Sequence, residues 1–433
     1  MSFFEKTFKL EEFNTNVRTE MLAGITTFMT MAYILAVNPA MLSETGMDMG
    51  AVFTATALAS FVGTLVMAFY ANLPFALAPG MGLNAFFVYT VVFQMGYSWQ
   101  FALTAVLLEG IIFIILTIFN VREAIINCIP TNVKKAISVG IGLFIAFIGF
   151  TNAGIIVQGQ GVPLMLGNLK APTSLVAIFG LLLMGMLLAK NVKGALFFGI
   201  LGATIIAIPL GVTSIPSIDS FSGVPSLKPI LFQFEFDKVF TIDMLIVLFT
   251  FLFVDMFDTV GTLIGVSEKA GMIDEKGNIP RVKQALMADA IATTFGAIVG
   301  TSTVTTYVES ASGVSEGGRT GLTALTTAVM FFLALFFAPI FLMIPGAATA
   351  PALIIVGLFM MSPIKTIDFA DYTEAIPAFL TIIMMPLSYA ISEGIIFGIL
   401  SYVILKVLSG RGKEVPTASY FLALLFIIKI LFV

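Results

Sequence analysis

The sequence of 433 residues is 59% hydrophobic and 11% charged, and its mean hydropathy is +1.06, which excludes a soluble globular protein and indicates a polytopic protein of the lipid bilayer. The net charge of −4 gives no reason to expect a nucleic-acid partner. The absence of His and the single cysteine, Cys128, exclude histidine-ligated metals, thiolate clusters, histidine proton relays and internal disulfides, so neither a metal nor a cofactor is expected.

The N-terminal segment carries charges but lacks the pattern of a cleaved signal peptide. We expect residues 1–20 to be cytoplasmic and the first apolar run to be a retained span. A helix needs about 20 mainly apolar residues to cross a bilayer. Runs that meet or approach this length predict about fourteen spans: 21–41, 51–71, 76–95, 100–119, 133–150, 173–189, 194–212, 241–265, 283–299, 302–316, 319–343, 349–362, 374–390 and 392–408.

Lys and Arg are distributed unevenly between alternate loops. If the N-terminus is cytoplasmic, 17 of the 21 basic residues fall on the inner side, and only Lys170, Lys228 and Lys238 fall outside. Retention of basic residues in the cytoplasm is what orients membrane proteins, so this partition supports both the span count and the orientation. We expect a multi-pass protein of the cell membrane.

The C-terminal segment, 416–433, is apolar and could form a fifteenth span. It contains Lys429 and follows a basic linker. These features favour a helix that lies at the inner interface or packs on the bundle, although the spanning alternative stays open.

The two halves of the chain share weak sequence similarity in the same order. Seven spans followed by seven more would place the second copy upside down, which is the inverted architecture of secondary transporters. The alternative is a chance match between Phe- and Leu-rich membrane segments. The matching pairs are 57–66 with 290–299, 103–106 with 322–325, and 193–201 with 393–400.

Two corresponding spans are interrupted, which in such repeats indicates the binding site. Segment 73–87, LPFALAPGMGLNAFF, contains two Pro and two Gly that prevent a continuous helix. Its counterpart, 301–308, is a β-branched run that favours an extended chain. Each segment is therefore predicted to be a short strand followed by a half helix, whose first N–H groups can face a ligand.

Several acids lie in apolar sequence without a basic residue nearby. Such residues are costly in a membrane and normally face a cavity or the bundle interior. Glu309, where the extended stretch should become helix, and Asp258 are the strongest substrate-site candidates. A helix-capping role is the alternative for Glu309. For Asp255, Glu109 and Asp289, hydrogen bonding in helix packing competes with a functional role, and Glu393 is expected to be solvated. Asn84, which carries both donor and acceptor groups, is a further candidate contact.

The chain resembles the purine branch of the nucleobase–cation symporters, the adenine/guanine/hypoxanthine permeases. The resemblance covers nearly the whole chain and rests on several long motifs in order: AGITTFMTMAYILAVNPAM (23–41), APGMGLNAFF (78–87), DMFDTVGTLIGV (255–266), TSTVTTYVESASGVSEGGRTGLTA (301–324) and EGIIFGILSY (393–402).

This resemblance implies an all-α polytopic fold, with short strands in spans 3 and 10, in which a core domain moves like an elevator against a gate domain. The expected divisions are core 21–120 (spans 1–4) and 241–343 (spans 8–11), gate 133–212 (spans 5–7) and 349–408 (spans 12–14), an extracellular connector 213–240, and the C-terminal helix 416–433. In related uracil permeases two glutamates contact the base. Motif matching places them at Asp258 and Glu309, with Thr259 and Thr262 where those relatives have His.

The function implied is import of guanine, hypoxanthine or adenine by H⁺ symport. A flat base that carries N–H groups suits paired carboxylates, and protonation of one acid would cancel its desolvation cost. Phe28 or Phe86 could pack on the ring. The expected substrate contacts are Asp258, Glu309, Asn84, Ala85, Val308, Thr262, Thr27, Phe28 and Phe86, and the proton-coupling candidates are Glu309, Asp258, Asp255 and Glu109.

Other functions fit the sequence less well. A xanthine or uracil permease of the same fold is the nearest alternative. An anion transporter should not have two acids crowding its site, a channel needs no discontinuous inverted pair, and an enzyme would need a nucleophile–base pair or metal constellation that the sequence lacks. The sequence leaves three points open: which purine is preferred, whether Na⁺ rather than H⁺ is the coupling ion, and the oligomeric state, for which a homodimer is one option.

Overall fold

The computed structural model describes residues 3–119, 131–159, 161–215, 223–272, 279 and 281–432. Cys128 and part of the expected connector, 216–222, lie outside the described residues. The described helices and strands are α1 (Phe3–Phe8), α2 (Val17–Met31), α3 (Ile34–Ser43), α4 (Met49–Val66), η1 (Met67–Ala71), β1 (Leu77–Pro79), α5 (Met81–Ala85), η2 (Phe86–Gln94), α6 (Trp99–Ile118), α8 (Thr131–Asn152), β2 (Ile156–Val157), β3 (Met165–Leu166), α9 (Pro172–Ala189), α10 (Ala195–Ala207), α11 (Ile242–Lys269), α12 (Val282–Val299), β4 (Val304–Thr306), α13 (Ser310–Ser315), α14 (Gly321–Ala334), η4 (Leu335–Phe337), α15 (Ala338–Leu342), α16 (Gly346–Met360), η5 (Ser362–Thr366), α17 (Tyr372–Ser388), α18 (Ile391–Leu408), η6 (Gly412–Glu414) and α19 (Thr417–Phe432).

The protein is mostly helical and crosses the membrane several times. Within the described residues, ten helices are long and apolar enough to span a bilayer, and three shorter apolar helices cover Met81–Gln94, Ala195–Ala207 and Tyr372–Ser388. The remaining predicted segment, 302–316, contains β4 and the six-residue α13. Ten long candidate spans are thus observed, and the count of fourteen in a 7+7 repeat stays a prediction.

The strands predicted in the two interrupted segments are present and pair with each other. β1 runs antiparallel to β4, with Leu77 opposite Thr306 and Pro79 opposite Val304. The ladder continues on both sides, because Gly80 N–H donates to Thr303 O at 2.9 Å and Tyr307 N–H donates to Ala76 O at 2.9 Å. The strands are buried in protein, which is where non-helical backbone is tolerated in a membrane protein.

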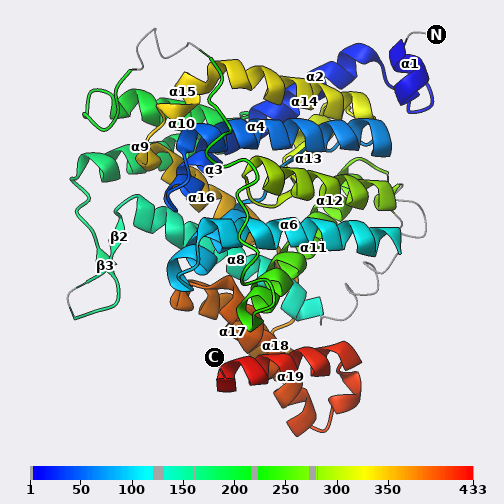
Figure 1. Ribbon diagram of the computed structural model, residues 1–433. Coiled ribbons are helices and arrows are strands. Elements are labelled where there is room, and N and C mark those ends of the chain that lie inside the picture. Colours follow the sequence, from blue (N-terminus) through cyan, green and yellow to red (C-terminus); the bar gives the residue numbers. More distant parts are fainter. Residues whose placement is uncertain are drawn as a thin grey trace.

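The helices pack mainly in two groups (Figure 1). One group contains α2, α3, α4, α6, α12 and α14, and the other contains α8, α9, α10, α16, α17 and α18. Within the second group α8 and α16 approach each other very closely. A Cβ added at Gly357 of α16 would lie only 2.4 Å from the Gly142 carbonyl oxygen of α8. Small residues allow such close contact between helices in membranes.

The ends of the chain differ from expectation in detail. α2 begins at Val17, inside the N-terminal segment predicted over 1–20, and Glu20 is completely buried. The apolar helix predicted over 416–433 is present as α19, which packs on α18. Phe426 of α19 also packs edge-on against Phe249 of α11, with 5.7 Å between the ring centroids. A second small antiparallel sheet, β2–β3, follows α8 and was not predicted.

Candidate functional site

Glu309 lies where β4 turns into α13. It immediately precedes Ser310, the first residue of that helix, and its side chain is half-buried. Among the described residues the Glu309 side chain makes no capping hydrogen bond to α13, so the helix-capping alternative is not realised. Instead, Glu309 Oε1 accepts a hydrogen bond from the Tyr33 hydroxyl at 2.7 Å.

Asp258 reaches the corresponding junction of the other interrupted segment. It lies on α11 and is half-buried. Its Oδ2 atom would be 3.9 Å from a Cβ on Gly80, the residue between β1 and α5. The Asp258 carboxyl lies close enough to those of Glu309 and Asp289 for the three groups to influence one another electrostatically. The fold therefore brings the two acids that the sequence singled out to the same region, from separate elements.

A buried polar network lies behind the strands. The Thr259 hydroxyl is 2.7 Å from Thr305 Oγ1, 3.0 Å from Asp289 Oδ1 and 3.2 Å from Asp255 Oδ1. Asp289 Oδ1 also accepts the backbone N–H of Thr306 at 3.2 Å. Asp289 thereby joins β4 and α11 to α12, whereas Asp255 accepts from a residue of its own helix. Both the packing role and the functional role of these acids stay predictions.

Glu109 has a similar environment on α6. It is completely buried, and its Oε2 atom accepts a hydrogen bond from the Thr303 hydroxyl at 2.5 Å. This contact holds the start of the β4 segment against α6. The contact joins α6 to the site region, and a role of Glu109 in coupling stays a prediction.

Asn84 combines a satisfied acceptor with a donor that has no partner among the described residues. The completely buried side chain accepts a hydrogen bond from the Ser302 hydroxyl through Oδ1, whereas Nδ2 makes none. A buried amide without an acceptor costs about 1–3 kcal/mol unless a ligand or water completes it. Asn84 therefore has the donor expected of a substrate contact.

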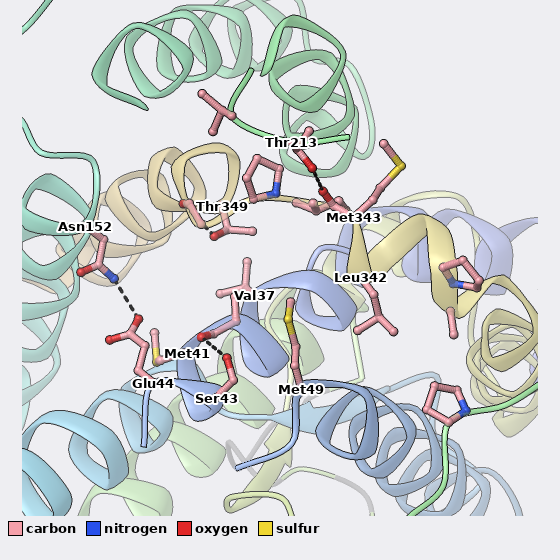
Figure 2. Close-up of a pocket in the computed structure, with 18 of the residues that line it drawn as sticks. Val37, Met41, Ser43, Glu44, Met49, Asn152, Thr213, Leu342, Met343 and Thr349 are labelled. Atoms are coloured by element: carbon pink, nitrogen blue, oxygen red, sulfur yellow. Dashed lines mark hydrogen bonds between the residues drawn. The ribbon is translucent and has the colours of Figure 1, made fainter. Parts of the chain in front are cut away.

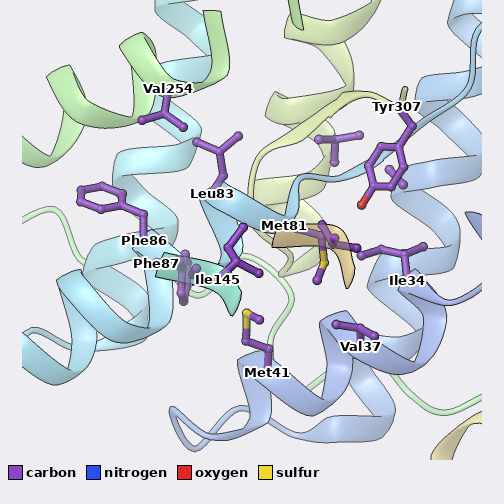
Figure 3. Packing of buried hydrophobic residues seen from close by; sticks show 14 of the residues in the cluster. Ile34, Val37, Met41, Met81, Leu83, Phe86, Phe87, Ile145, Val254 and Tyr307 are labelled. Atoms are coloured by element: carbon purple, nitrogen blue, oxygen red, sulfur yellow. The ribbon is translucent and has the colours of Figure 1, made fainter. Parts of the chain in front are cut away.

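The remaining predicted contacts differ in their surroundings. Phe86 is completely buried and packs edge-on against Phe251, with 4.8 Å between the ring centroids. Phe28 is 8% exposed and packs edge-on against Phe331, with 5.2 Å between the ring centroids. Figure 3 shows Phe86 within the apolar cluster around Leu83 and Phe87, with Tyr307 and Ile34 on the other side of Met81. The other predicted contacts are Ala85, Thr27 and Thr262, which are buried, and Val308, which is 52% exposed.

A cavity of about 680 Å³ lies elsewhere, between the two helix groups (Figure 2). Its lining includes Val37, Met41, Glu44 and Asn152 but neither Asp258 nor Glu309. Glu44 accepts hydrogen bonds from the Tyr89 hydroxyl at 3.1 Å and from Asn152 Nδ2 at 3.3 Å. Burial raises the pKa of Glu44, against the opposing effect of these two donors. Val37 is one helical turn from Tyr33, but Tyr33 does not line this cavity.

Comparison with known proteins shows which family this chain belongs to. The Permease family (Xan_ur_permease) matches residues 18–397. The adenine permease AdeP of Escherichia coli is 44% identical over 429 residues, covering 99% of this chain and 96% of AdeP. The guanine/hypoxanthine permease PbuG of Bacillus subtilis is 43% identical over 436 residues, covering 98% and 99%. The chain belongs to the nucleobase permease family, in its purine branch.

The fold of this permease has a structural counterpart as well. The transmembrane domain of the cyanobacterial bicarbonate transporter BicA superposes with a TM-score of 0.66 over 88% of this chain and 97% of that domain. Sequence identity is 16%, so the similarity concerns the fold alone. The permease is a multi-pass membrane protein, and its family points to a transporter rather than an enzyme.

Two residues of the site region were missed from the sequence. Tyr33 holds Glu309, and Glu20 accepts the backbone N–H groups of Arg319, Thr320 and Thr323 at 2.9–3.2 Å, which fixes the start of α14. A tyrosine in an apolar run signals a hydroxyl that needs a partner. No feature of the sequence indicated a buried role for Glu20, because it lies in the charged N-terminal segment that was expected to be a cytoplasmic tail.

Proposed function

We propose that this permease carries purine nucleobases, namely adenine, guanine and hypoxanthine, into the cell. The observation that supports this most strongly is the convergence of Asp258 and Glu309 beside the paired strands β1 and β4. Carboxylates accept the N–H groups of a purine, and the unpaired Asn84 amide can donate to a ring nitrogen or carbonyl. The names of relatives that are more than 40% identical support the same substrate class.

The proposed binding site also includes the buried Thr27, Phe28, Ala85, Phe86 and Thr262 and the more exposed Val308. Two neighbouring negative charges disfavour an anionic substrate, which argues against anion transport by this permease. Xanthine and uracil remain the alternative substrates within the same fold.

We also propose coupling to H⁺, which the same pair of acids supports. Among the described residues, neither Asp258 nor Glu309 forms an ion pair with Lys or Arg. A proton on one of them would remove a charge from the membrane interior when the substrate leaves. Asp255 and Glu109 are secondary candidates, since each is engaged by a threonine hydroxyl.

The test is uptake of radiolabelled adenine, guanine, hypoxanthine, xanthine and uracil by cells that lack their own permeases. We expect saturable uptake of at least one purine, and a protonophore should abolish its accumulation. Uptake of none of the purines would contradict the proposed substrate class. Accumulation that survives the protonophore but requires Na⁺ would contradict H⁺ coupling alone.

The transport movement is proposed to be an elevator-like shift of a core domain, 21–120 with 241–343, against a gate domain, 133–212 with 349–408. The preferential packing of the helices in two groups supports this division. We further propose fourteen spans in an inverted 7+7 repeat, with β1 and β4 in equivalent spans, a cytoplasmic N-terminus and location in the cell membrane.

Cross-linking tests this movement. Glu44 and Asn152 lie in different proposed domains and are hydrogen-bonded to each other. In a Cys128→Ser background, a short bifunctional thiol reagent should stop uptake when it joins Glu44→Cys to Asn152→Cys. The control pair, Asn132→Cys with Glu374→Cys, joins α8 to α17 inside the gate and should leave uptake intact. Equal uptake by both cross-linked pairs would contradict movement at this interface.

A further inference from the structure

Tyr33 lies at the break between α2 and α3. The turn at Ala32 and Tyr33 separates the two helices, and Tyr33 is 1% exposed. Such a buried phenol needs a hydrogen-bond partner. The break matters because it places this hydroxyl opposite β4 and α13, which lie almost 280 residues further along the chain.

The Tyr33 hydroxyl has a specific partner in the Glu309 carboxylate. It donates to Oε1 at 2.7 Å, and among the described residues Tyr33 is the one side chain that donates to this carboxylate. The neighbouring Tyr307 hydroxyl donates instead to the Pro79 carbonyl oxygen, at 2.5 Å, and so supports β1. The two buried tyrosines therefore have different roles, and only Tyr33 acts on the acid.

The bond from Tyr33 occupies one acceptor site of Glu309 Oε1 and fixes the orientation of the carboxylate, and no other side chain among the described residues donates to it. A freely oriented carboxylate can turn both oxygens toward two adjacent parallel N–H groups, as in bidentate pairs. A carboxylate that a phenol holds through one oxygen is better placed to accept a single N–H group. Among purines, guanine presents an adjacent ring N–H and exocyclic amine, whereas hypoxanthine presents single ring N–H groups.

We propose that Tyr33 is a positioning and specificity-determining residue, which orients Glu309 so that its carboxylate accepts one N–H of the base rather than an adjacent pair. This inference rests on the proposed purine transport. It adds which arrangement of N–H groups on the base the site prefers. Tyr33 would set this preference through its contact with Glu309, rather than through a contact with the base.

The test compares Tyr33→Phe with the unaltered permease in uptake of hypoxanthine and guanine over a range of concentrations. Loss of a hydrogen bond to a charged group should raise the apparent KM for hypoxanthine by about tenfold. The KM for guanine should change less, since the freed oxygen can accept a second N–H. The guanine-to-hypoxanthine KM ratio should therefore fall by about threefold or more. Tyr402→Phe, a buried tyrosine on α18, should leave the ratio unchanged.

A KM does not depend on the amount of permease in the membrane, so partial misfolding does not obscure this readout. If uptake by Tyr33→Phe is too low, displacement of radiolabelled hypoxanthine by guanine from the purified variant gives the same ratio. Equal changes for both bases, or a lower maximal rate with unchanged KM values, would overturn the role of Tyr33. An unaltered permease that carries no purine would instead contradict the proposed function.

Discussion

The Asp289 carboxylate accepts the backbone N–H of Thr306 at 3.2 Å, and this bond fixes a strand of the candidate site to the helix behind it. Thr306 is the last residue of β4 and is paired with Leu77 of β1. The Thr293 hydroxyl, one turn further along α12, donates to the Val304 carbonyl oxygen at 2.9 Å. Both ends of β4 are therefore held by α12, and Glu309 follows only three residues after Thr306.

Substitution of Asp289 should show how far this anchor stabilises the permease. Asp289→Ala leaves the buried Thr306 N–H without its acceptor, which should cost about 2–3 kcal/mol, whereas the Thr259 hydroxyl keeps Asp255 and Thr305 as partners. Asp289→Asn keeps one oxygen and should cost about 1 kcal/mol. The apparent Tm of the purified protein in detergent measures both. Identical Tm values for the two variants and the unaltered protein would show that the bond does not hold β4.

The contact between Gly142 and Gly357 predicts a steric effect within the second helix group. A Cβ added at Gly357 would lie 2.4 Å from the Gly142 carbonyl oxygen, so Gly357→Ala should push α16 away from α8 and destabilise the fold by about 1–3 kcal/mol. Gly185→Ala on α9 is the matched control, because nothing lies within 4 Å of its added Cβ. The apparent Tm should fall for the first variant and stay equal or rise for the second. The reverse order would contradict the close packing.

An ion cluster outside the spans predicts a pH dependence. Arg411 donates to Asp371 at 2.6 Å and to both oxygens of Glu414 at 2.8 Å. These hydrogen bonds lower the pKa of Asp371 and of Glu414 to about 2, from ordinary values of 3.8 and 4.5. A lowered carboxyl pKa means that the stabilisation is present above the ordinary value and is lost as the pH falls toward 2.

The variant Arg411→Gln tests this cluster. Its apparent Tm should lie below that of the unaltered permease at pH 7, and the difference should shrink as the pH falls from about 4.5 to 2. Arg18→Gln, at an exposed arginine near the other end of the chain, should show no such pH-dependent difference. A difference for Arg411→Gln that is constant across this range would contradict an ionic origin.

Local chemistry explains which parts of the fold could be predicted from the sequence. Pro and Gly in 73–87 and the β-branched run in 301–308 forbid ordinary helix, and both strands were confirmed. The ten long apolar helices follow from hydropathy alone. The β2–β3 sheet was missed because each strand has only two residues, with no hydrophobic alternation to mark it.

The site was harder to predict, because its contacts join residues that are distant along the chain. An acid in apolar sequence is energetically costly in a membrane, and this alone made Asp258 and Glu309 candidates without any knowledge of the fold. The partner of Glu309 could not be identified this way, since Tyr33 lies 276 residues away and no local pattern relates the two. Asp255 and Asp289 looked like acids of the same kind, and only the fold shows that they bind Thr259.

The most direct test of the account is equilibrium binding of radiolabelled hypoxanthine and adenine to the purified permease and to variants of the acid pair. The unaltered protein should bind at least one of these bases saturably, and Asp258→Asn and Glu309→Gln should each lose high-affinity binding while remaining folded. Glu316→Gln, seven residues beyond Glu309 and just after α13, is the control that should bind normally. Unchanged affinity in both Asp258→Asn and Glu309→Gln would contradict the assignment of these acids as the substrate site.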